Sequence, residues 1–304
     1  MEMIDFTLMP QRKKAYSGAN GNKLSILYNN EVYMVKFPSP PSINKEMSYT
    51  NSCISEYIGC HIFELIGIPV QETLLGTYKI NGKEKIVVAC KDFAQHGKQL
   101  QDFASLKNQA ITSSRGGYGT ELSDILYAIE EQKSVSPKII VERFWDMFIV
   151  DALIGNWDRH NGNWGFLYDE NTDTQVLAPV FDCGSCLCPQ ADEEMMIKVL
   201  TKKNELNYRV FEHPTSSITI NNKRIKYFDY ISSLENPNCN SALKRIVPRI
   251  NLSEIYDVID DISCINDTQK KFYKLIITER KDKILDYSLK LLLEPKQNLN
   301  IRRR

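Results

Sequence analysis

The sequence lacks an excess of charge of either sign. Its 304 residues contain 38 Lys plus Arg and 38 Asp plus Glu, so the formal net charge is +0 at pH 7. A protein that coats nucleic acid needs surplus cations to neutralise phosphates, so we expect no nucleic-acid partner. Attachment to a membrane surface through net charge is disfavoured for the same reason.

The sequence also lacks long hydrophobic runs. The most apolar stretch, Phe144–Ile154, contains two aspartates and is shorter than the roughly 20 residues that a membrane-spanning helix needs. The first eight residues have no basic start before an apolar run, so they do not resemble a secretory signal. We therefore expect no transmembrane segment, a cytoplasmic location and reduced thiols on the 8 cysteines.

Three of these cysteines are clustered. Cys183, Cys186 and Cys188 form a C-x-x-C-x-C pattern. No second cysteine or histidine pair follows at a spacing typical of zinc fingers, so a fourth zinc ligand is missing. The pattern therefore favours small, semi-buried side chains in a tight loop over a metal site.

The hydrophobic patterns predict an α+β fold in which a small β-rich region precedes a larger, mainly helical region. Asn-Asn and Asn-Gly pairs between β-rich runs predict two hairpins. Pro137 is typical of the first turn of a helix. The predicted strands are Leu24–Tyr28, Val32–Phe37, Val70–Tyr78, Lys85–Ala89, Trp164–Tyr168 and Val176–Phe181, and the predicted helices are Ser52–Leu65, Pro137–Ile154 and Phe272–Leu293.

The change from strands to helices falls near residues 90–100. We expect an N-terminal lobe over residues 1–93 and a C-terminal lobe over 94–304, with a ligand site in the cleft between them. The glycine-rich stretch Gly116–Gly119 has no strand before it and no clear helix after it, which indicates a mobile loop.

The most informative stretch runs from Asp158 to Asn163. The D-x-x-x-x-N spacing matches the catalytic loop of protein kinases. Phosphoryl transfer needs one carboxylate to orient the acceptor hydroxyl and an amide oxygen to bind Mg²⁺, which prefers hard oxygen ligands. Asp182, followed by Cys183-Gly184 one hairpin later, suits a second metal ligand. Each of the two motifs alone is weak evidence for a kinase, but the two motifs in this order and at this spacing are specific evidence.

Two features of the N-terminal region fit the same chemistry. Lys36 lies in an apolar strand, where a charge is costly unless it is paired, and Glu56 on the next predicted helix can pair with it. Tyr16–Lys23 is rich in Gly and Asn, so its N–H groups can form a nest for a phosphate. An exposed lysine and a plain surface turn are the alternatives.

Two neighbours of the candidate base are less clear. His160 is assigned to the catalytic loop, because no partner histidine lies at a helical spacing. Arg159 either helps to neutralise phosphate charge or holds the loop in place, and the sequence does not separate these roles.

On these motifs the chain resembles the HipA-like family of bacterial serine/threonine kinases. The resemblance implies a two-lobed protein-kinase-like fold that uses ATP and Mg²⁺ and transfers the γ-phosphoryl group to a protein Ser or Thr hydroxyl. It implies Asp158 as the catalytic base and Asn163 and Asp182 as metal ligands. The implied ATP-binding residues are Ser17, Gly18, Asn20, Gly21, Lys23, Lys36, Glu56, Lys91, Asp92, Phe93, His160, Asn163 and Asp182, with Lys91, Asp92 and Phe93 meeting adenine at the hinge.

The chain departs from the family pattern in two ways. HipA has an additional N-terminal domain that helps to bind its antitoxin, whereas this sequence starts almost at the phosphate loop, so antitoxin pairing is not expected. HipA also has a regulatory serine three residues before its loop glycine. Here that position is Ala15, and the adjacent Tyr16 and Ser17 are the candidates for autophosphorylation.

Two other functions are compatible with the motifs. Phosphoinositide or small-molecule kinases also use a D-R-H-x-x-N loop, although a basic cluster for a membrane substrate is missing before the terminal arginines. A pseudokinase that only binds partners is disfavoured because Lys36, Asp158, Asn163 and Asp182 are all retained. The sequence leaves the oligomeric state open, and the resemblance to short, cell-translocating members of the family leaves translocation into host cells as an alternative location.

Overall fold

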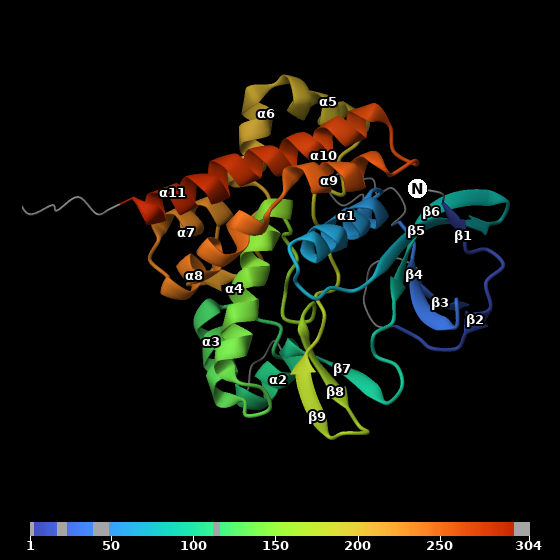
Figure 1. The fold of residues 1–304 in the computed structure, drawn as a ribbon, viewed down its shortest axis with the longest axis horizontal. Helices are drawn as coiled ribbons and strands as arrows, with labels where there is room; N and C mark the ends of the chain where they lie inside the picture. Colours follow the sequence, from blue (N-terminus) through green and yellow to red (C-terminus); the bar gives the residue numbers. More distant parts are fainter. Residues whose placement is uncertain (1–2, 17–22, 39–48, 112–115, 295–304) are drawn as a thin grey trace, which may run out of the picture.

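The computed structural model describes residues 3–16, 23–38, 49–111 and 116–294. An N-terminal region built on a β-sheet lies against a larger region that is mainly helical (Figure 1). This confirms the expected α+β architecture. Among the described residues, no helix is both long and apolar enough to cross a bilayer.

The N-terminal sheet has six strands in the order β1-β5-β6-β4-β3-β2. Its strand pairs are antiparallel except for β1 and β5. The strands are β1 (Ile4–Asp5), β2 (Gln11–Arg12), β3 (Lys23–Tyr28), β4 (Glu31–Lys36), β5 (Thr73–Ile80) and β6 (Lys83–Lys91). The four longer strands lie within a few residues of the predicted ones.

Both predicted hairpin turns are present. Asn29 and Asn30, between β3 and β4, have φ angles of 49° and 62°. Asn81 and Gly82, between β5 and β6, have φ angles of 50° and 75°. Two successive residues with positive φ form the turn that matches the twist of a two-residue hairpin, and Asn and Gly adopt this conformation most readily.

Helix α1 (Ser52–Leu65) begins and ends where the sequence predicts. It packs on β5 and β6 and also contacts α4 and α9 of the helical region. Ile58 and Ile62 are fully buried in the main hydrophobic core, which therefore runs through α1 from the sheet into the helices. A second, smaller core is formed by side chains of the sheet and of the chain after β1: Phe6, Ile26, Tyr33, Val35, Phe37, Tyr78, Val87 and Ala89.

Helix α4 (Pro137–Ile154) forms the centre of the helical region. Pro137 begins it, as predicted, and Gly155 ends it in the left-handed conformation with φ 62°. Every residue from Phe144 to Ile154 is buried, which identifies a helix surrounded by protein on all sides. The other α-helices are α2 (Phe103–Ala110), α3 (Leu122–Glu131), α5 (Glu193–Thr201), α6 (Lys203–Asn207), α7 (Tyr227–Ser233), α8 (Pro237–Ile246), α9 (Leu252–Asp260), α10 (Asp267–Arg280) and α11 (Tyr287–Leu293).

The last long helical segment starts earlier than its apolar face indicates. Helix α10 begins at Asp267 rather than Phe272, and it continues through a π-helical turn, Lys281–Asp286, into α11. Asn266 and Gln269 form a capping box in which each side chain accepts a hydrogen bond from the backbone N–H of the other. The polar first turn therefore lies before the first apolar residue, where hydrophobic periodicity does not detect it.

A three-stranded sheet below α4 has the order β7-β8-β9 (Figure 1). It consists of β7 (Lys98–Asp102), β8 (Gly165–Asp169) and β9 (Thr174–Leu177). The sequence does not predict β7, because its side chains are mostly exposed and all but Leu100 are polar. Strand β9 ends at Leu177, not at Phe181, so Asp182 lies outside the strand, just after an isolated bridge between Val70 and Val180.

Candidate active site

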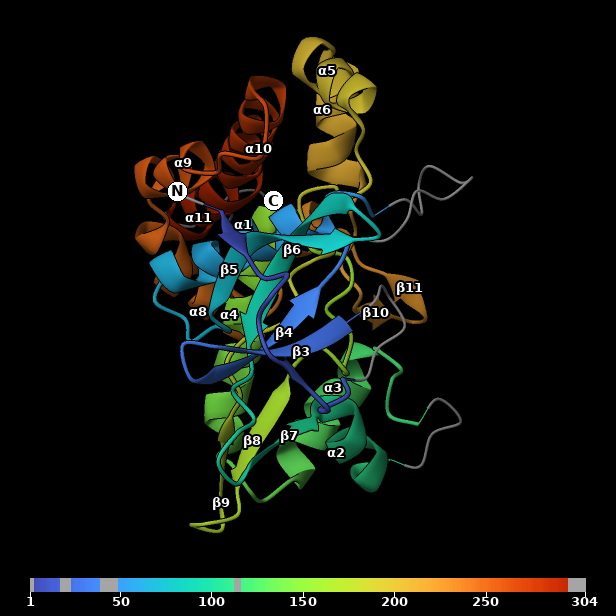
Figure 2. The ribbon, with the colours of Figure 1, turned by 90° about the vertical axis from the view of Figure 1, so that its right-hand side faces the viewer.

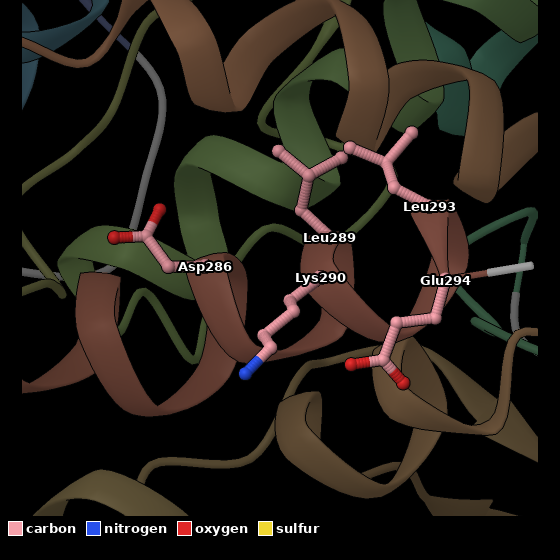
Figure 3. Close-up of a pocket in the computed structure, with 5 residues that line it drawn as sticks. All are labelled: Asp286, Leu289, Lys290, Leu293 and Glu294. Carbon is pink, nitrogen blue, oxygen red and sulfur yellow. The ribbon is translucent and has the colours of Figure 1, made fainter.

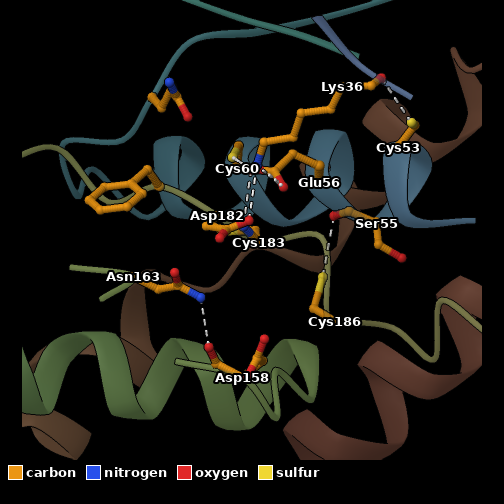
Figure 4. A network of polar contacts seen from close by, with 12 residues as sticks. Lys36, Cys53, Ser55, Glu56, Cys60, Asp158, Asn163, Asp182, Cys183 and Cys186 are labelled. Carbon is orange, nitrogen blue, oxygen red and sulfur yellow. Dashed lines mark hydrogen bonds and ion pairs between the residues drawn. The ribbon is translucent and has the colours of Figure 1, made fainter. Parts of the chain in front are cut away.

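Lys36, Glu56 and Asp182 meet beneath the N-terminal sheet (Figure 4). Lys36, the last residue of β4, places its Nζ 2.9 Å from Glu56 Oε2 and 2.9 Å from Asp182 Oδ1. Glu56 comes from α1 and its side chain is 1% exposed, whereas the side chain of Asp182 is 43% exposed. The site therefore has a buried ion pair on one side and an accessible carboxylate on the other.

The charges of this cluster are mutually stabilised. Burial lowers the pKa of Lys36, but attraction to Asp182 and Glu56 outweighs burial and raises that pKa well above its usual value. Burial raises the pKa of Asp182, but the nearby Lys36 outweighs it and holds the pKa below its ordinary value. These shifts favour the charged forms of Lys36 and Asp182. The accessible, charged carboxylate of Asp182 suits a divalent cation.

Glu56 also holds the segment that carries Asp182. Its Oε1 accepts a hydrogen bond from the backbone N–H of Cys183 at 3.1 Å. Asp182 has a φ angle of 60°, a left-handed conformation that Asp and Asn tolerate better than most residues. One buried carboxylate thus fixes both the lysine and the backbone next to the second aspartate.

Asp158 and Asn163 lie across from this cluster, in the loop after α4 (Figure 4). The amide nitrogen of Asn163 donates to the backbone carbonyl of Asp158 at 2.9 Å, so the amide oxygen is left to act as a ligand. Among the described residues, no hydrogen bond reaches the carboxylate of Asp158. Burial raises its pKa, and the nearby Asp182 adds to this, against the opposing effect of His160. This carboxylate is therefore available to accept a proton.

Arg159 holds the loop together. It is 8% exposed, and its Nε and Nη2 donate to the two carboxylate oxygens of Asp151 at 3.0 and 3.2 Å. Its Nη1 donates to the carbonyls of Asn163, at 3.0 Å, and Phe181. These bonds tie the end of α4, the loop and the segment before Asp182 to one guanidinium. The geometry decides between the two roles left open by the sequence, because the positioning contacts occupy this side chain.

The loop is also attached to the stretch that was expected to be mobile. Asn161 Nδ2 donates to the carbonyls of Gly117 and Gly119, both at 2.8 Å. The buried Lys107 donates to the Gly119 carbonyl at 2.6 Å. Residues 117–119 are therefore anchored, contrary to the prediction. No sequence motif indicates Asn161 or Lys107 as anchors, because the carbonyls that they hold belong to the backbone.

Gly117 is the tightest point of this attachment. Its φ angle is 81°, and a Cβ atom built there would lie 1.9 Å from the Ala104 carbonyl oxygen. We expect Gly117→Ala to lower the free energy of unfolding by about 2 kcal/mol, through backbone strain and this clash. The measurement is urea denaturation.

Gly116→Ala is the matched control. Gly116 also has a positive φ, 54°, but a Cβ there meets nothing within 4 Å. It should therefore cost only the strain, about 1 kcal/mol. Equal losses in the two variants would contradict the close approach at Gly117.

The predicted phosphate loop is only partly described. Ser17, Gly18, Asn20 and Gly21 lie outside the described residues. Lys23, which follows the loop, is paired in register with Lys36 across β3 and β4. Burial lowers the pKa of Lys23, and repulsion from Lys36 adds to this effect. Two lysines on neighbouring strands therefore raise the positive potential where a phosphate would lie.

The residue before the loop contacts the predicted hinge. The Tyr16 hydroxyl donates to Asp92 Oδ2 at 2.8 Å, and Lys14 Nζ lies 2.5 Å from the same oxygen. The N–H groups of Lys91 and Asp92 are used internally, by the carbonyls of Glu72 and Val32. Of the three expected hinge residues, Phe93 is the one whose backbone N–H makes no hydrogen bond within the described part of the chain. Its ring lies 5.7 Å from that of Phe181.

His160 and the three clustered cysteines contact only other parts of the protein among the described residues. His160 Nδ1 accepts the N–H of Gly162 at 3.0 Å within the loop. Cys183, Cys186 and Cys188 are fully or almost fully buried free thiols, more buried than the sequence indicates. Among the described residues, no group of three or more His, Cys, Asp or Glu side chains is arranged to hold a metal ion.

A surface cavity of about 460 Å³ lies elsewhere, on α11 (Figure 3). It is lined by Asp286, Leu289, Lys290, Leu293 and Glu294. None of these residues belongs to the site described above, and the cavity is open and shallow.

Comparison with known proteins gives consistent matches. The HipA-like C-terminal domain family matches residues 15–234. The serine/threonine-protein kinase CtkA of Helicobacter pylori is 50% identical over 303 residues, which cover 98% of this chain and 92% of that protein. The crystal structure of the H. pylori proinflammatory kinase CtkA superposes with a TM-score of 0.89 at 48% identity, over 96% of this chain and 99% of that one.

A more distant structure shares the fold. HipA of Shewanella oneidensis, solved in a complex with HipB and operator DNA, has a TM-score of 0.53 at 13% identity. The match covers 92% of this chain and 69% of that chain. The arrangement of sheet and helices is therefore that of HipA-type kinase folds.

Proposed function

The chain belongs to the HipA-like C-terminal domain family and is a serine/threonine kinase, and on this premise we propose that it transfers the γ-phosphoryl group of ATP, bound with Mg²⁺, to a protein hydroxyl. The observation that carries this proposal is the contact of Lys36 with both Glu56 and Asp182, at 2.9 Å each. Kinases use such a lysine to hold nucleotide phosphates and such an aspartate to hold the metal.

The oxygen atoms of the site fit magnesium. The accessible carboxylate of Asp182 and the amide oxygen of Asn163, which no described residue contacts by a hydrogen bond, are hard ligands. Two protein ligands leave coordination positions for phosphate and water oxygens. Bound Mg²⁺ would neutralise the charge that develops on the phosphates during transfer.

Phosphate binding, acceptor orientation and positioning are assigned to different residues of the chain. Lys36 would hold the α- and β-phosphates, with Lys23 beside them. Asp158 would orient the acceptor hydroxyl and take its proton, since no other hydrogen bond within the described residues occupies its carboxylate. Arg159 would keep Asp158, Asn163 and Asp182 at a fixed spacing through its bonds to the backbone. Catalysis then depends on positioning and charge neutralisation.

We further propose that adenine meets the hinge at Lys91–Phe93, with the boundary between the lobes at residue 93. Phe93 has a backbone N–H that no described residue uses, and the rings of Phe93 and Phe181 form an apolar wall. Tyr16 and Ser17 remain the candidates for autophosphorylation. The hydrogen bond from the Tyr16 hydroxyl to Asp92 supports a position near the proposed hinge.

Labelling with γ-labelled ATP and Mg²⁺ tests the activity. The purified protein is incubated with generic protein acceptors and, separately, with phosphoinositides. Label on Ser or Thr of protein supports the proposal, label on lipid supports a lipid kinase, and nucleotide binding without any label supports a pseudokinase.

Asp182→Asn tests the metal site. Loss of one carboxylate ligand should weaken Mg²⁺-dependent ATP binding by about tenfold to a hundredfold, while binding in EDTA changes little. Isothermal titration with and without Mg²⁺ measures both. Asp173→Asn is the matched control, because Asp173 also has a positive φ, 51°, but lies in the exposed turn before β9. Unchanged Mg²⁺ dependence in Asp182→Asn would remove this residue from the metal site.

A further inference from the structure

A short hairpin stands beside the candidate catalytic loop. It consists of β10 (Thr219–Ile220) and β11 (Lys223–Arg224) and projects from the edge of the helical region (Figure 2). Its basic residues Lys223 and Arg224 are exposed. None of the roles assigned above uses this hairpin.

The hairpin is held rigidly. The carboxylate of Glu121 accepts bonds from Thr219 Oγ1 at 2.8 Å and from the turn N–H groups of Asn221 and Asn222 at 2.6 and 3.1 Å. Just before β10, the hydroxyl of Ser217 donates to the backbone carbonyl of Arg159 at 2.7 Å. The hairpin is therefore fixed to the loop that carries Asp158.

Arg224 points along this loop. Its Nη1 donates to the backbone carbonyl of Trp157 at 3.1 Å, and its Cζ lies 5.6 Å from the centre of the Trp157 ring. Trp157 directly precedes Asp158, and the charge of Arg224 acts to lower the pKa of Asp158. The guanidinium is thus oriented by a carbonyl and an indole face beside the candidate base.

Within the part of the chain that the structure describes, the guanidinium of Arg224 forms no ion pair. Among the described residues, no carboxylate lies within ion-pairing distance of it, and a guanidinium has five N–H donors of which one is used here. A planar guanidinium that is held in place and keeps free donors is suited to bidentate binding of a carboxylate. The ring of Tyr49, 5.9 Å from that of Trp157, extends the apolar surface around it.

We propose that Arg224 is a specificity-determining residue that binds an acidic side chain flanking the acceptor Ser or Thr. The proposal rests on the kinase function proposed above. An acceptor segment that approaches Asp158 passes Trp157 and Arg224, because these residues adjoin that carboxylate. Since the net charge of the protein is +0, selection of acidic segments must come from such a local cation.

Matched peptides test this selection. Each peptide has one Ser acceptor and a Glu or a Gln at one flanking position, and kcat/KM is measured for every position with γ-labelled ATP. The wild-type protein should prefer Glu over Gln by about fivefold at one position. Arg224→Gln should bring this ratio to about one, and Arg224→Glu should reverse it in favour of a Lys-flanked peptide.

Lys223→Gln is the control, because it removes a neighbouring exposed charge that does not contact Trp157. It should keep the wild-type preference. The proposal is overturned if the wild-type protein treats Glu and Gln peptides alike, or if Arg224→Gln lowers kcat/KM equally for both. If the wild-type protein labels neither peptides nor protein acceptors, the kinase function itself is contradicted, which is a separate outcome.

Discussion

Asp158→Asn should lower the rate of phosphoryl transfer by about three orders of magnitude while ATP binding persists. The amide cannot accept the proton of the acceptor hydroxyl. The local backbone should be unaffected, because Asn163 bonds to the main-chain carbonyl of Asp158 and not to its carboxylate. Transfer is followed with γ-labelled ATP, and nucleotide affinity by titration.

The variant separates catalysis from binding. Asp173→Asn, in the exposed turn, serves as the control and should keep full activity. Undiminished labelling by Asp158→Asn would exclude Asp158 as the base. Loss of ATP affinity together with activity would instead indicate that the substitution disturbs the site as a whole.

The same residue predicts how activity depends on pH. Burial and the nearby Asp182 raise the pKa of Asp158, so it takes up a proton at higher pH than an ordinary aspartate. The base acts only when it is unprotonated. We therefore expect kcat/KM of the wild-type protein to fall as pH drops through this raised pKa. The residual rate of Asp158→Asn should not show this acidic fall. If the acidic fall in kcat/KM persists in the variant, it comes from the titration of another group.

Among the variants considered for stability, Arg159→Met should cause the largest loss, about 3–5 kcal/mol in the free energy of unfolding. Methionine fills much of the volume but leaves the carboxylate of Asp151, 1% exposed, without its cation. It also removes the donor to the carbonyls of Asn163 and Phe181. Urea denaturation measures the loss, and a double variant with Asp151→Asn should recover part of it.

The stability deficit should depend on pH in a definite direction. Burial already raises the pKa of Asp151 despite the opposing attraction of Arg159, and removing Arg159 raises it further. When the pKa of a group is higher in the folded than in the unfolded state, the free energy of unfolding of the protein falls as pH rises. The deficit of Arg159→Met should therefore be larger at about pH 8 than at about pH 5.

An exposed ion pair provides the control for this variant. Lys198 and Glu194 form a solvent-exposed pair one helical turn apart, 2.7 Å between Nζ and Oε1. Lys198→Met should change stability by less than about 0.5 kcal/mol at either pH. A similar, small effect of Arg159→Met would mean that the buried pair does not hold the loop.

Elements whose structure depends on residues close in sequence are predictable here, and elements that depend on pairing with distant segments are not. The bounds of α1 and α4 follow from apolar spacing, and in α4 also from Pro137 and Gly155 at its ends. The two hairpins follow from Asn and Gly pairs that accept positive φ. Strand β7 is not predictable in this way, because it is stabilised by pairing with β8 and its own side chains are polar except for Leu100.

The same distinction applies to the site. The spacing of Asp158 and Asn163 identifies the loop, because both residues belong to one local motif. The role of Arg159 depends on Asp151 at the end of a helix and on carbonyls more than twenty residues later, so no spacing rule reveals it. The order of residues likewise gives no indication that Asn161 would hold Gly117 and Gly119.

Helix α1 has a consequence for how such an enzyme is controlled. It carries Glu56, yet it is embedded in a core shared by the sheet and by α4 and α9. Swinging it outward to break the Lys36 pair would expose Ile58, Ile62 and Phe63, at about 1.5–3 kcal/mol for each side chain. The lysine–glutamate pair is therefore assembled when the chain folds and is not a switch that is set afterwards. We therefore expect any control of activity to leave α1 in place and to act on other parts of the molecule.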